Sequence, residues 1–275
     1  MIEHLEDWLW EIGEAAQRLC ELSALEGSAG NISLFLPADT PGLTAHLTDQ
    51  FSEEREVTLP GGSELPAGVV VITGAGRRLR DASTHPDAVL CAIVIAENGA
   101  ATLHRAPGHG VLPTSEIDSH FGIHAAILAS RPALHAVVHA QPPKLTWLSQ
   151  IPSYREQARL NRQLLRWQPE TIATLPEGIG ILPFETPGTA EQGAATVEAM
   201  RRHQLLVWAK HGVVARSTRG PLAATDLIDY AEAAADYEVT DLLAGRPADG
   251  LSLAELRAIA TRFGTPTELL NTLPE

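Results

Sequence analysis

Polar side chains alternate along a short apolar segment near the middle of the chain. His135, Val137, His139 and Gln141 occupy every second position, so in a β-strand all four side chains leave the same face. A neutral imidazole on a rigid strand is a good ligand for a borderline metal such as zinc. A hydrogen-bonded core histidine is the alternative for each position taken alone.

Two further positions could complete such a site. His211 lies beside a glycine between two apolar runs, in an expected hairpin turn. Glu116 lies at an expected helix start, where a carboxylate beside a metal could act as general base for a proton next to a carbonyl. A first-turn residue favoured by the helix dipole is the alternative for Glu116. His120 and His124 follow on the same helix face, and we interpret them as packing or bridging residues.

Three short segments have the composition of phosphate-binding loops. Glycine lets backbone N–H groups approach an anion closely, and a helix start adds partial positive charge. None has the spacing of a nucleotide-binding fingerprint, so each could also be a simple turn. The segments are Gly27-Ser28-Ala29-Gly30-Asn31, Thr73-Gly74-Ala75-Gly76 before Arg77 and Arg78, and Thr114-Ser115.

Composition excludes several classes of protein. The 275 residues include 20 Lys or Arg and 34 Asp or Glu, for a formal net charge of -14. This charge predicts no nucleic-acid partner and no membrane surface, so an anionic ligand must be bound locally. Cys20 and Cys91 are far apart, which argues against a disulfide scaffold. The acidic start of the sequence and the lack of a long apolar run predict a soluble cytoplasmic protein.

The hydrophobic pattern predicts an α/β fold of one domain over residues 1–275. Hairpins join neighbouring strands as often as helices do, which favours a central mixed, mainly antiparallel sheet flanked by helical layers. Residues 37–66 have no sustained period and are expected to be mostly loop, with one short strand. The expected strands are 32–36, 68–73, 89–96, 101–104, 134–140, 178–182, 205–208 and 213–216. The expected helices are 5–25, 115–130, 144–148, 157–167, 188–203, 221–243 and 253–263.

The order of the short motifs resembles the class II aldolase/adducin family over nearly the whole chain. The matching segments are Gly30-Asn31, Thr73-Gly74-x-Gly76, Pro113-Thr114-Ser115-Glu116, Val138-His139-Ala140-Gln141, Gly178-Ile179-Gly180-Ile181-Leu182-Pro183, Pro187-Gly188-Thr189, His211-Gly212-Val213 and Arg262-Phe263-Gly264. The resemblance implies a mainly antiparallel sheet between helical layers and a homotetramer with active sites at subunit interfaces. It also implies a zinc ion held by histidines.

The resemblance assigns roles to individual residues. His139, Gln141 and His211 occupy metal-ligand positions, and Glu116 occupies the position of the catalytic acid/base. Glu170 falls near a family glutamate that acts across the subunit boundary. The implied reaction is metal-dependent aldol cleavage of a ketose 1-phosphate to dihydroxyacetone phosphate and L-lactaldehyde. The segments that bind the sugar phosphate contain Ser28, Asn31, Gly74, Gly76, Thr114 and Ser115.

Three positions depart from the family pattern. An amide, Gln141, replaces the second imidazole of a His-x-His pair, which predicts weaker zinc binding or another divalent metal unless His135 or Glu116 takes part. Ser28 replaces an expected asparagine, and Ala75 replaces an expected serine. A related aldolase, epimerase or dehydratase with another sugar phosphate is therefore an alternative, as is a non-catalytic member like adducin.

Overall fold

A sheet of nine strands runs through the computed structural model, which describes residues 5–59, 64–129, 133–245 and 247–274. The strands are β1 (Asn31–Pro37), β2 (Glu53–Val57), β3 (Gly68–Thr73), β4 (Leu90–Ile95), β5 (Ala101–Arg105), β6 (His135–Ala140), β7 (Ile179–Leu182), β8 (Leu205–Trp208) and β9 (Gly212–Ser217). Their order is β2-β5-β4-β3-β1-β6-β9-β8-β7. Only the β7–β8 pair is parallel among the described strands. The expected mixed, mainly antiparallel sheet is thus confirmed.

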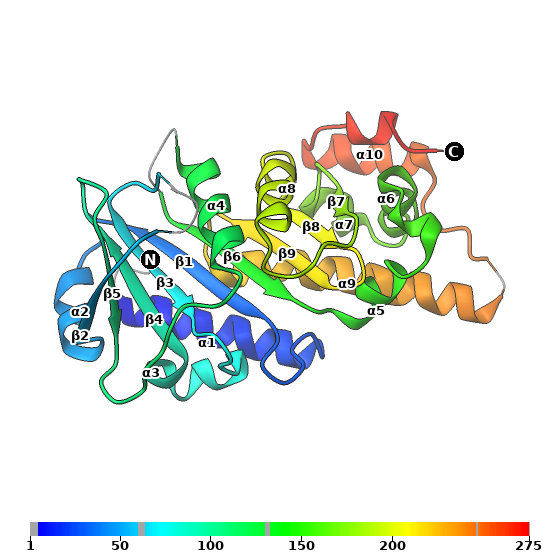
Figure 1. The fold of residues 1–275 in the computed structure, drawn as a ribbon. Helices are drawn as coiled ribbons and strands as arrows, with labels where there is room; N and C mark the ends of the chain where they lie inside the picture. The colour runs from blue at the N-terminus through cyan, green and yellow to red at the C-terminus, as the bar shows by residue number, and fades with distance from the viewer. Residues whose placement is uncertain (1–4, 60–63, 130–132, 246, 275) are drawn as a thin grey trace.

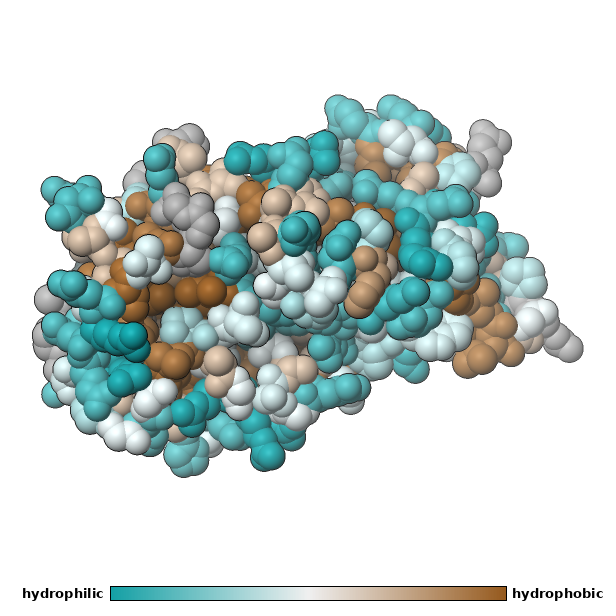
Figure 2. Space-filling view, viewed as in Figure 1, coloured by the Kyte–Doolittle hydropathy of each residue, from teal (hydrophilic) through white to brown (hydrophobic). Residues whose placement is uncertain are grey.

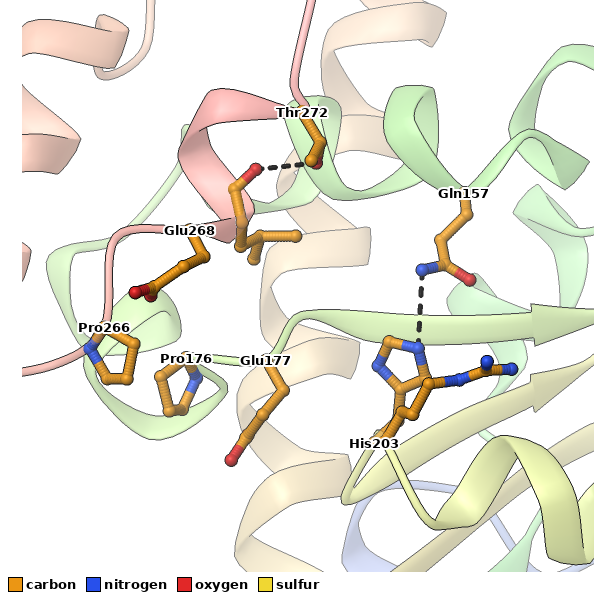
Figure 3. A pocket seen from close by; sticks show the side chains of 9 residues that line it. Gln157, Pro176, Glu177, His203, Pro266, Glu268 and Thr272 are labelled. Atoms are coloured by element: carbon orange, nitrogen blue, oxygen red, sulfur yellow. Dashed lines mark hydrogen bonds between the residues drawn. The ribbon is translucent and has the colours of Figure 1, made fainter.

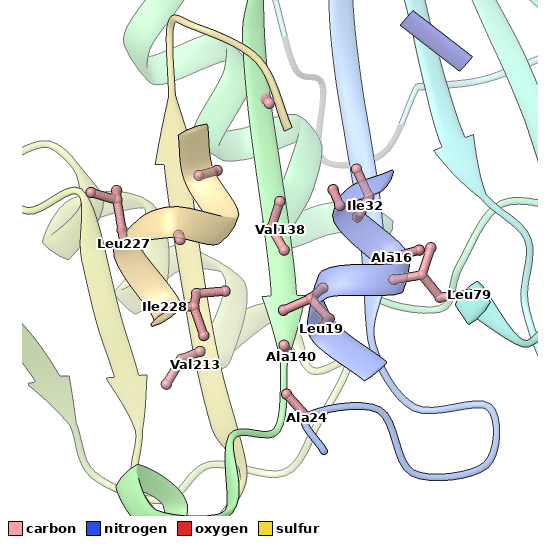
Figure 4. Close-up of a cluster of buried hydrophobic side chains, with 14 of the residues drawn as sticks. Ala16, Leu19, Ala24, Ile32, Leu79, Val138, Ala140, Val213, Leu227 and Ile228 are labelled. Atoms are coloured by element: carbon pink, nitrogen blue, oxygen red, sulfur yellow. The ribbon is translucent and has the colours of Figure 1, made fainter. Parts of the chain in front are cut away.

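Helices cover both faces of the sheet (Figure 1). On one face, α1 (Leu5–Glu21) and α9 (Pro221–Ala244) pack on β1, β6 and β9, and Figure 4 shows this core with Leu19, Val138 and Ile228 interleaved. On the other face, α4 (Ile117–Leu128) and α8 (Ala190–Met200) pack on the sheet through residues such as Phe121 and Met200. Strands β3 and β4 contribute alternate residues to the cores on both faces, so they read in the sequence as continuous apolar runs.

The remaining helices surround the ends of the sheet. A smaller core joins α6, α7 and α10 through Leu165, Ile172 and Leu256. Figure 1 places α6, α7 and α10 together beside β7, at the end of the molecule that holds the C-terminus. The bounds of these elements are α2 (Leu43–Gln50), α3 (Pro86–Val89), α5 (Pro143–Leu148), α6 (Gln157–Leu165), α7 (Pro169–Thr174) and α10 (Leu253–Phe263).

Most expected elements form, with differences at their ends. The first helix stops at Glu21, and Ser23 has a left-handed φ of 56°. Residues 37–66 contain the expected short strand, β2, but also α2, which was not predicted. The N-cap of α2 is Gly42, without a side-chain cap hydrogen bond, so the sequence carries no start signal there. The expected end, near Ser130, of the helix predicted over 115–130 lies outside the described residues.

The surface is mainly polar on the face shown in Figure 2, with apolar atoms gathered where α9 ends. Leu242 and Leu243 near that end expose 43% and 77% of their surface. No helix in the described part of the chain combines the length and hydropathy that a membrane crossing requires.

Candidate functional site

Loops from distant parts of the chain meet at one edge of the sheet. Strand β1 is antiparallel to both β3 and β6, so its first residues lie beside the last residues of those two strands. Asn31 at the start of β1 pairs in register with His139 near the end of β6. The segment before α4 joins the same edge, because the Thr114 N–H donates to the Thr73 carbonyl at 2.9 Å.

His139 has one ring nitrogen bound to the backbone and the other directed at the site. Its Nδ1 lies 2.8 Å from the Val213 carbonyl oxygen on β9. A carbonyl only accepts hydrogen bonds, so Nδ1 carries a proton, and in the neutral ring Nε2 presents a lone pair. That Nε2 lies 3.7 Å from Oε2 of Glu116. This is the arrangement in which histidines bind metals, with the second nitrogen held by an outer partner.

His211 enters the site from the turn between β8 and β9. The turn is tight, because a Cβ on the next residue, Gly212, would lie 2.5 Å from the Ala140 carbonyl oxygen. The His211 ring stacks on Trp208, with centroids 5.2 Å apart, and its Nε2 lies 3.7 Å from Oε1 of Glu116. Burial, followed by the proximity of His139, lowers the pKa of His211 to about 4, which leaves the ring neutral at pH 7.

Glu116 lies between the two imidazoles and is 8% exposed. Its Oε2 also accepts a hydrogen bond from Nδ2 of Asn31 at 2.9 Å. Burial raises the pKa of the Glu116 carboxyl, but His139 and the Asn31 hydrogen bond, with smaller effects from nearby histidines, outweigh it and the pKa is lowered. The group is therefore a carboxylate at neutral pH, able to accept a proton or bind a cation.

The donors of these three residues meet the requirements of a divalent cation. One carboxylate oxygen and one nitrogen from each of His139 and His211 lie within 4.8 Å of one another. Two imidazoles and a carboxylate, with room for an exchangeable ligand, form a donor set typical of zinc and similar metals in catalytic sites. Gln141, just after β6, lines the same pocket, where its amide oxygen can add a further donor.

The pocket gathers every predicted site residue except Glu170. It has a volume of about 220 Å³. Its lining residues are Ser28, Ala29, Gly30, Asn31, Gly74, Ala75, Gly76, Thr114, Ser115, Glu116, His139, Gln141 and His211. Glu170 is exposed in the first turn of α7, outside this pocket of a single chain. His135, considered as a compensating ligand, is also outside it.

Two glycines shape the anion side of the pocket. A Cβ on Gly74 would lie 2.4 Å from the Val111 side chain and 3.1 Å from the Val89 carbonyl oxygen. Gly76 has a φ of +67° with open space beside it. A larger residue is therefore excluded by contact at the first position and by backbone strain at the second. The pocket lining contains no Lys or Arg among the described residues, so backbone N–H groups, hydroxyls and a cation must bind any phosphate.

A larger cavity, of about 460 Å³, lies at the far end of the sheet between α6, the start of β7 and the C-terminal segment (Figure 3). Among its side chains, Gln157 faces His203, while Glu177 and Glu268 add negative charge. No group of three metal-ligating residues meets there among the described residues. The smaller pocket, which holds such a group, is therefore the candidate functional site.

Some residues that shape the site were not predicted from the sequence. Trp208 contacts both imidazoles, with its ring centroid 4.8 Å from that of His139. Its Nε1 donates to Thr196 Oγ1 on α8 at 2.9 Å, which fixes the indole plane. A tryptophan at the end of an apolar strand is normally interpreted as a core residue. Only the position of Trp208, three residues before His211, could have indicated that it contacts the site histidines.

A comparison with protein families shows where this chain belongs. The model of the "Class II Aldolase and Adducin N-terminal domain" matches residues 11–239. The chain belongs to the class II aldolase and adducin family. A rhamnulose-1-phosphate aldolase of Yersinia pseudotuberculosis serotype O:1b (strain IP 31758) is 32% identical over 243 residues, covering 86% of each chain. The family and its aldolase-named relatives make this class II aldolase homologue an enzyme of the lyase class.

Solved structures show the same fold. A sugar-phosphate aldolase from Thermotoga maritima superposes with a TM-score of 0.73 at 27% identity, covering 90% of this chain and 99% of its own. An L-fuculose-1-phosphate aldolase from Thermus thermophilus gives a TM-score of 0.53 at 18% identity, covering 89% and 100% of the two chains. The second likeness supports the class II aldolase fold alone.

Proposed function

We propose that this protein is a metal-dependent aldolase that cleaves a ketose 1-phosphate, most like L-rhamnulose 1-phosphate, to dihydroxyacetone phosphate and L-lactaldehyde. The observation that carries the proposal is the meeting of Glu116, His139 and His211 in the pocket that also contains the glycine and hydroxyl segments. A relative named for this substrate at 32% identity supports the choice of sugar.

His139, His211 and Gln141 would hold the cation, with zinc as the first candidate and another divalent metal as the alternative because of the amide ligand. When bound, the cation would supply Lewis acidity at the substrate carbonyl. The segments containing Ser28, Asn31, Gly74, Gly76, Thr114 and Ser115 would bind and orient the phosphate through N–H groups and hydroxyls. These contacts would place the reacting carbons next to Glu116.

Glu116 would act as the catalytic acid/base. In cleavage the C4 hydroxyl loses its proton as the C3–C4 bond breaks, and the Glu116 carboxylate would take up a proton and deliver it to C3, so the proton released at C4 balances the one gained at C3. In condensation Glu116 would remove the C3 proton, and the new C4 hydroxyl would gain one. The lowered pKa keeps Glu116 in the carboxylate form that proton removal in the second direction requires. The alternatives are an aldolase, epimerase or dehydratase acting on another sugar phosphate, and a non-catalytic family member. The intact group of one carboxylate and two imidazoles argues against a non-catalytic member.

We further propose a cytoplasmic homotetramer with its sites at subunit interfaces, to which Glu170 contributes from a neighbour. Exposed apolar side chains such as Leu243 and the placement of Glu170 outside the pocket of its own chain support this assembly. The acidic net charge supports small sugar phosphates as partners rather than nucleic acid or membrane.

The test measures metal content by mass spectrometry together with dihydroxyacetone phosphate release from L-rhamnulose 1-phosphate and L-fuculose 1-phosphate. We expect stoichiometric metal and chelator-sensitive release, fastest with the first sugar. Glu116→Gln should abolish release and retain the metal, while Glu56→Gln, at an exposed position on the edge strand β2, should change neither. Absence of metal and release after zinc or manganese loading would refute the proposal, and undiminished release by Glu116→Gln would remove that residue from its role.

A further inference from the structure

A continuous series of buried hydrogen bonds connects Glu116 to the interior between α4, β1 and β6. It starts with the Asn31 amide, which contacts Nε2 of His120 as well as Glu116. Ser33 Oγ then lies 2.6 Å from His120 Nδ1 and 2.8 Å from His124 Nε2. We call Ser33, His120, His124 and His135 the histidine relay, and each of the four is 0% exposed.

The relay ends at His135 on β6. Its Nδ1 lies 2.8 Å from His124 Nδ1, and the two rings meet edge to face at 81°. Its Nε2 is buried and has no hydrogen-bond partner among the described residues. Ser33 lies on β1, His135 lies on β6, and His120 and His124 lie one turn apart on one face of α4, so three elements bring the four residues together.

The carboxylate decides the direction of the first hydrogen bonds. Glu116 can only accept, so the Asn31 amide must present Nδ2 to it and Oδ1 to His120. His120 therefore donates from Nε2. In a neutral ring this leaves Nδ1 as the acceptor, so the Ser33 hydroxyl donates its single proton to His120.

The directions of the hydrogen bonds from Ser33 to His135 are then fixed by the same rule. Because Ser33 has given its proton to His120, it must accept from Nε2–H of His124. His124 then accepts at Nδ1 from Nδ1–H of His135, which leaves Nε2 of His135 without a proton. The orphaned atom is thus an acceptor rather than a buried donor. Every donor in the series from His135 to His120 points toward the Asn31 amide.

Burial keeps these rings neutral, as the series requires. It lowers the pKa of His120 to about 4 and that of His135 to about 3, and it lowers the pKa of His124 well below its ordinary value. A charged ring would carry two N–H donors and would face a second donor within the series. The neutral state is therefore required both by desolvation and by hydrogen-bond direction.

We propose that the histidine relay is a positioning device that holds the Asn31 amide with its NH₂ group toward Glu116, and so orients the catalytic carboxylate. This inference rests on the proposed role of Glu116. A reversed amide would place Oδ1 against the carboxylate and Nδ2 against an N–H group of His120. The relay opposes that reversal because it would invert every tautomer in the series and leave Nε2–H of His135 as a buried donor without a partner. The relay residues are positioning residues, since none of them lines the pocket.

The first test is the tautomeric state of the wild-type protein in solution at neutral pH. Long-range ¹H–¹⁵N spectra of protein labelled at histidine distinguish protonated from bare ring nitrogens. We expect His120 and His124 to carry the proton on Nε2 and His135 to carry it on Nδ1. A reversed tautomer or a charged ring at any of the three would overturn the proposal. This result does not depend on turnover.

The second test breaks the series at Ser33. Ser33→Ala removes the hydroxyl without reaching the pocket, and we expect mixed His120 tautomers and a kcat about tenfold lower, with KM changed less than about twofold. Ser33→Thr retains the hydroxyl and should restore most of kcat. The matched control is Ser217→Ala, a buried serine at the end of β9 outside the relay, which should preserve both constants. Wild-type kcat in Ser33→Ala, or equal losses in the Ala and Thr variants, would refute the relay.

The two tests also separate the proposals. An inactive wild-type protein with the expected tautomers would contradict the aldolase function and leave the hydrogen-bond directions established. An active protein with reversed tautomers would contradict only the positioning role.

Discussion

The two nitrogens of a metal-site histidine need different environments, and His139 provides them. The Val213 carbonyl holds the proton on Nδ1 and also sets the ring plane. The indole of Trp208 limits rotation from the other side. His139 therefore presents its Nε2 lone pair without a conformational search, which reduces the entropy lost on binding a cation.

Gln141 is the weak donor of the site. Restoring an imidazole with Gln141→His should raise zinc affinity by about tenfold or more, because imidazole suits zinc better than an amide oxygen. Competition with a chromophoric chelator measures the change. Gln150→His, at an exposed position after α5, is the matched control and should leave affinity unchanged. Unchanged affinity in Gln141→His itself would place residue 141 outside the metal's ligands.

At the scale of elements, two similar sequence signals have different outcomes. Ser252-x-x-Glu255 has the sequence pattern of a capping box and forms one at the start of α10, with both reciprocal hydrogen bonds present. Ser115-x-x-Asp118 does not, because α4 begins at Ile117 and its N-cap, Glu116, makes no side-chain cap. The Glu116 side chain instead turns toward Asn31 and the two imidazoles. At the start of α4, contacts of Glu116 within the site therefore take the place of a side-chain cap of the helix.

This difference predicts that two serine substitutions change stability by different amounts. Ser252→Ala should lower the free energy of unfolding by about 1 kcal/mol, the usual cost of losing an N-cap. Ser115→Ala should leave stability nearly unchanged, because no cap is lost, while its place in the pocket makes it a test of substrate binding. Urea denaturation at pH 7 measures both. Equal destabilisation by the two variants would show that the cap of α10 has no special role.

At the scale of the whole molecule, buried histidines connect stability to pH. In the folded protein burial lowers the pKa of His120 and His135 to about 4 and 3 from an ordinary value of 6.5. Below pH 6.5 the unfolded chain binds protons that the folded chain does not, so the free energy of unfolding falls as pH falls. Glu232 acts in the opposite sense, because burial raises its pKa to about 7.

A single variant isolates the histidine contribution. His135→Phe should make the slope of unfolding free energy against pH, between about pH 6 and 5, shallower by about 1.4 kcal/mol per pH unit, which is one proton. Urea titrations of both proteins across this range give the two slopes. Equal slopes in the wild-type protein and in His135→Phe would mean that His135 is protonated in the folded state. His85→Phe, at an exposed position, is the control.

Assembly can be tested through Glu170. If each site uses Glu116 from one chain and Glu170 from its neighbour, Glu116→Gln and Glu170→Gln are each inactive as homotetramers. Dissociating and reassembling an equal mixture should restore about one quarter of wild-type sites, because some interfaces then hold both native glutamates. If both variants are folded but the mixed tetramers recover no activity, the site is not shared between neighbours. The two glutamates then act within one chain, or Glu170 has no role in the site.

Local patterns in the sequence were sufficient to predict most elements and the side-chain directions within them. The alternation from His135 to Gln141 and the hairpin turn at His211 are short-range features, set by backbone geometry within a few residues. The order of the motifs was enough to predict the family. The sequence carried no comparable signal for α2, whose start has no side-chain cap.

The tertiary structure decided which polar residues meet. Asn31, Glu116 and His211 come together because β1 lies antiparallel between β3 and β6 and because the β8–β9 turn reaches the same edge. It also assigned two histidines of one strand face to different tasks: His139 to the pocket and His135 to a buried relay. The physical reason is that periodicity determines the direction of a side chain, whereas strand order, register and helix packing determine what that side chain contacts.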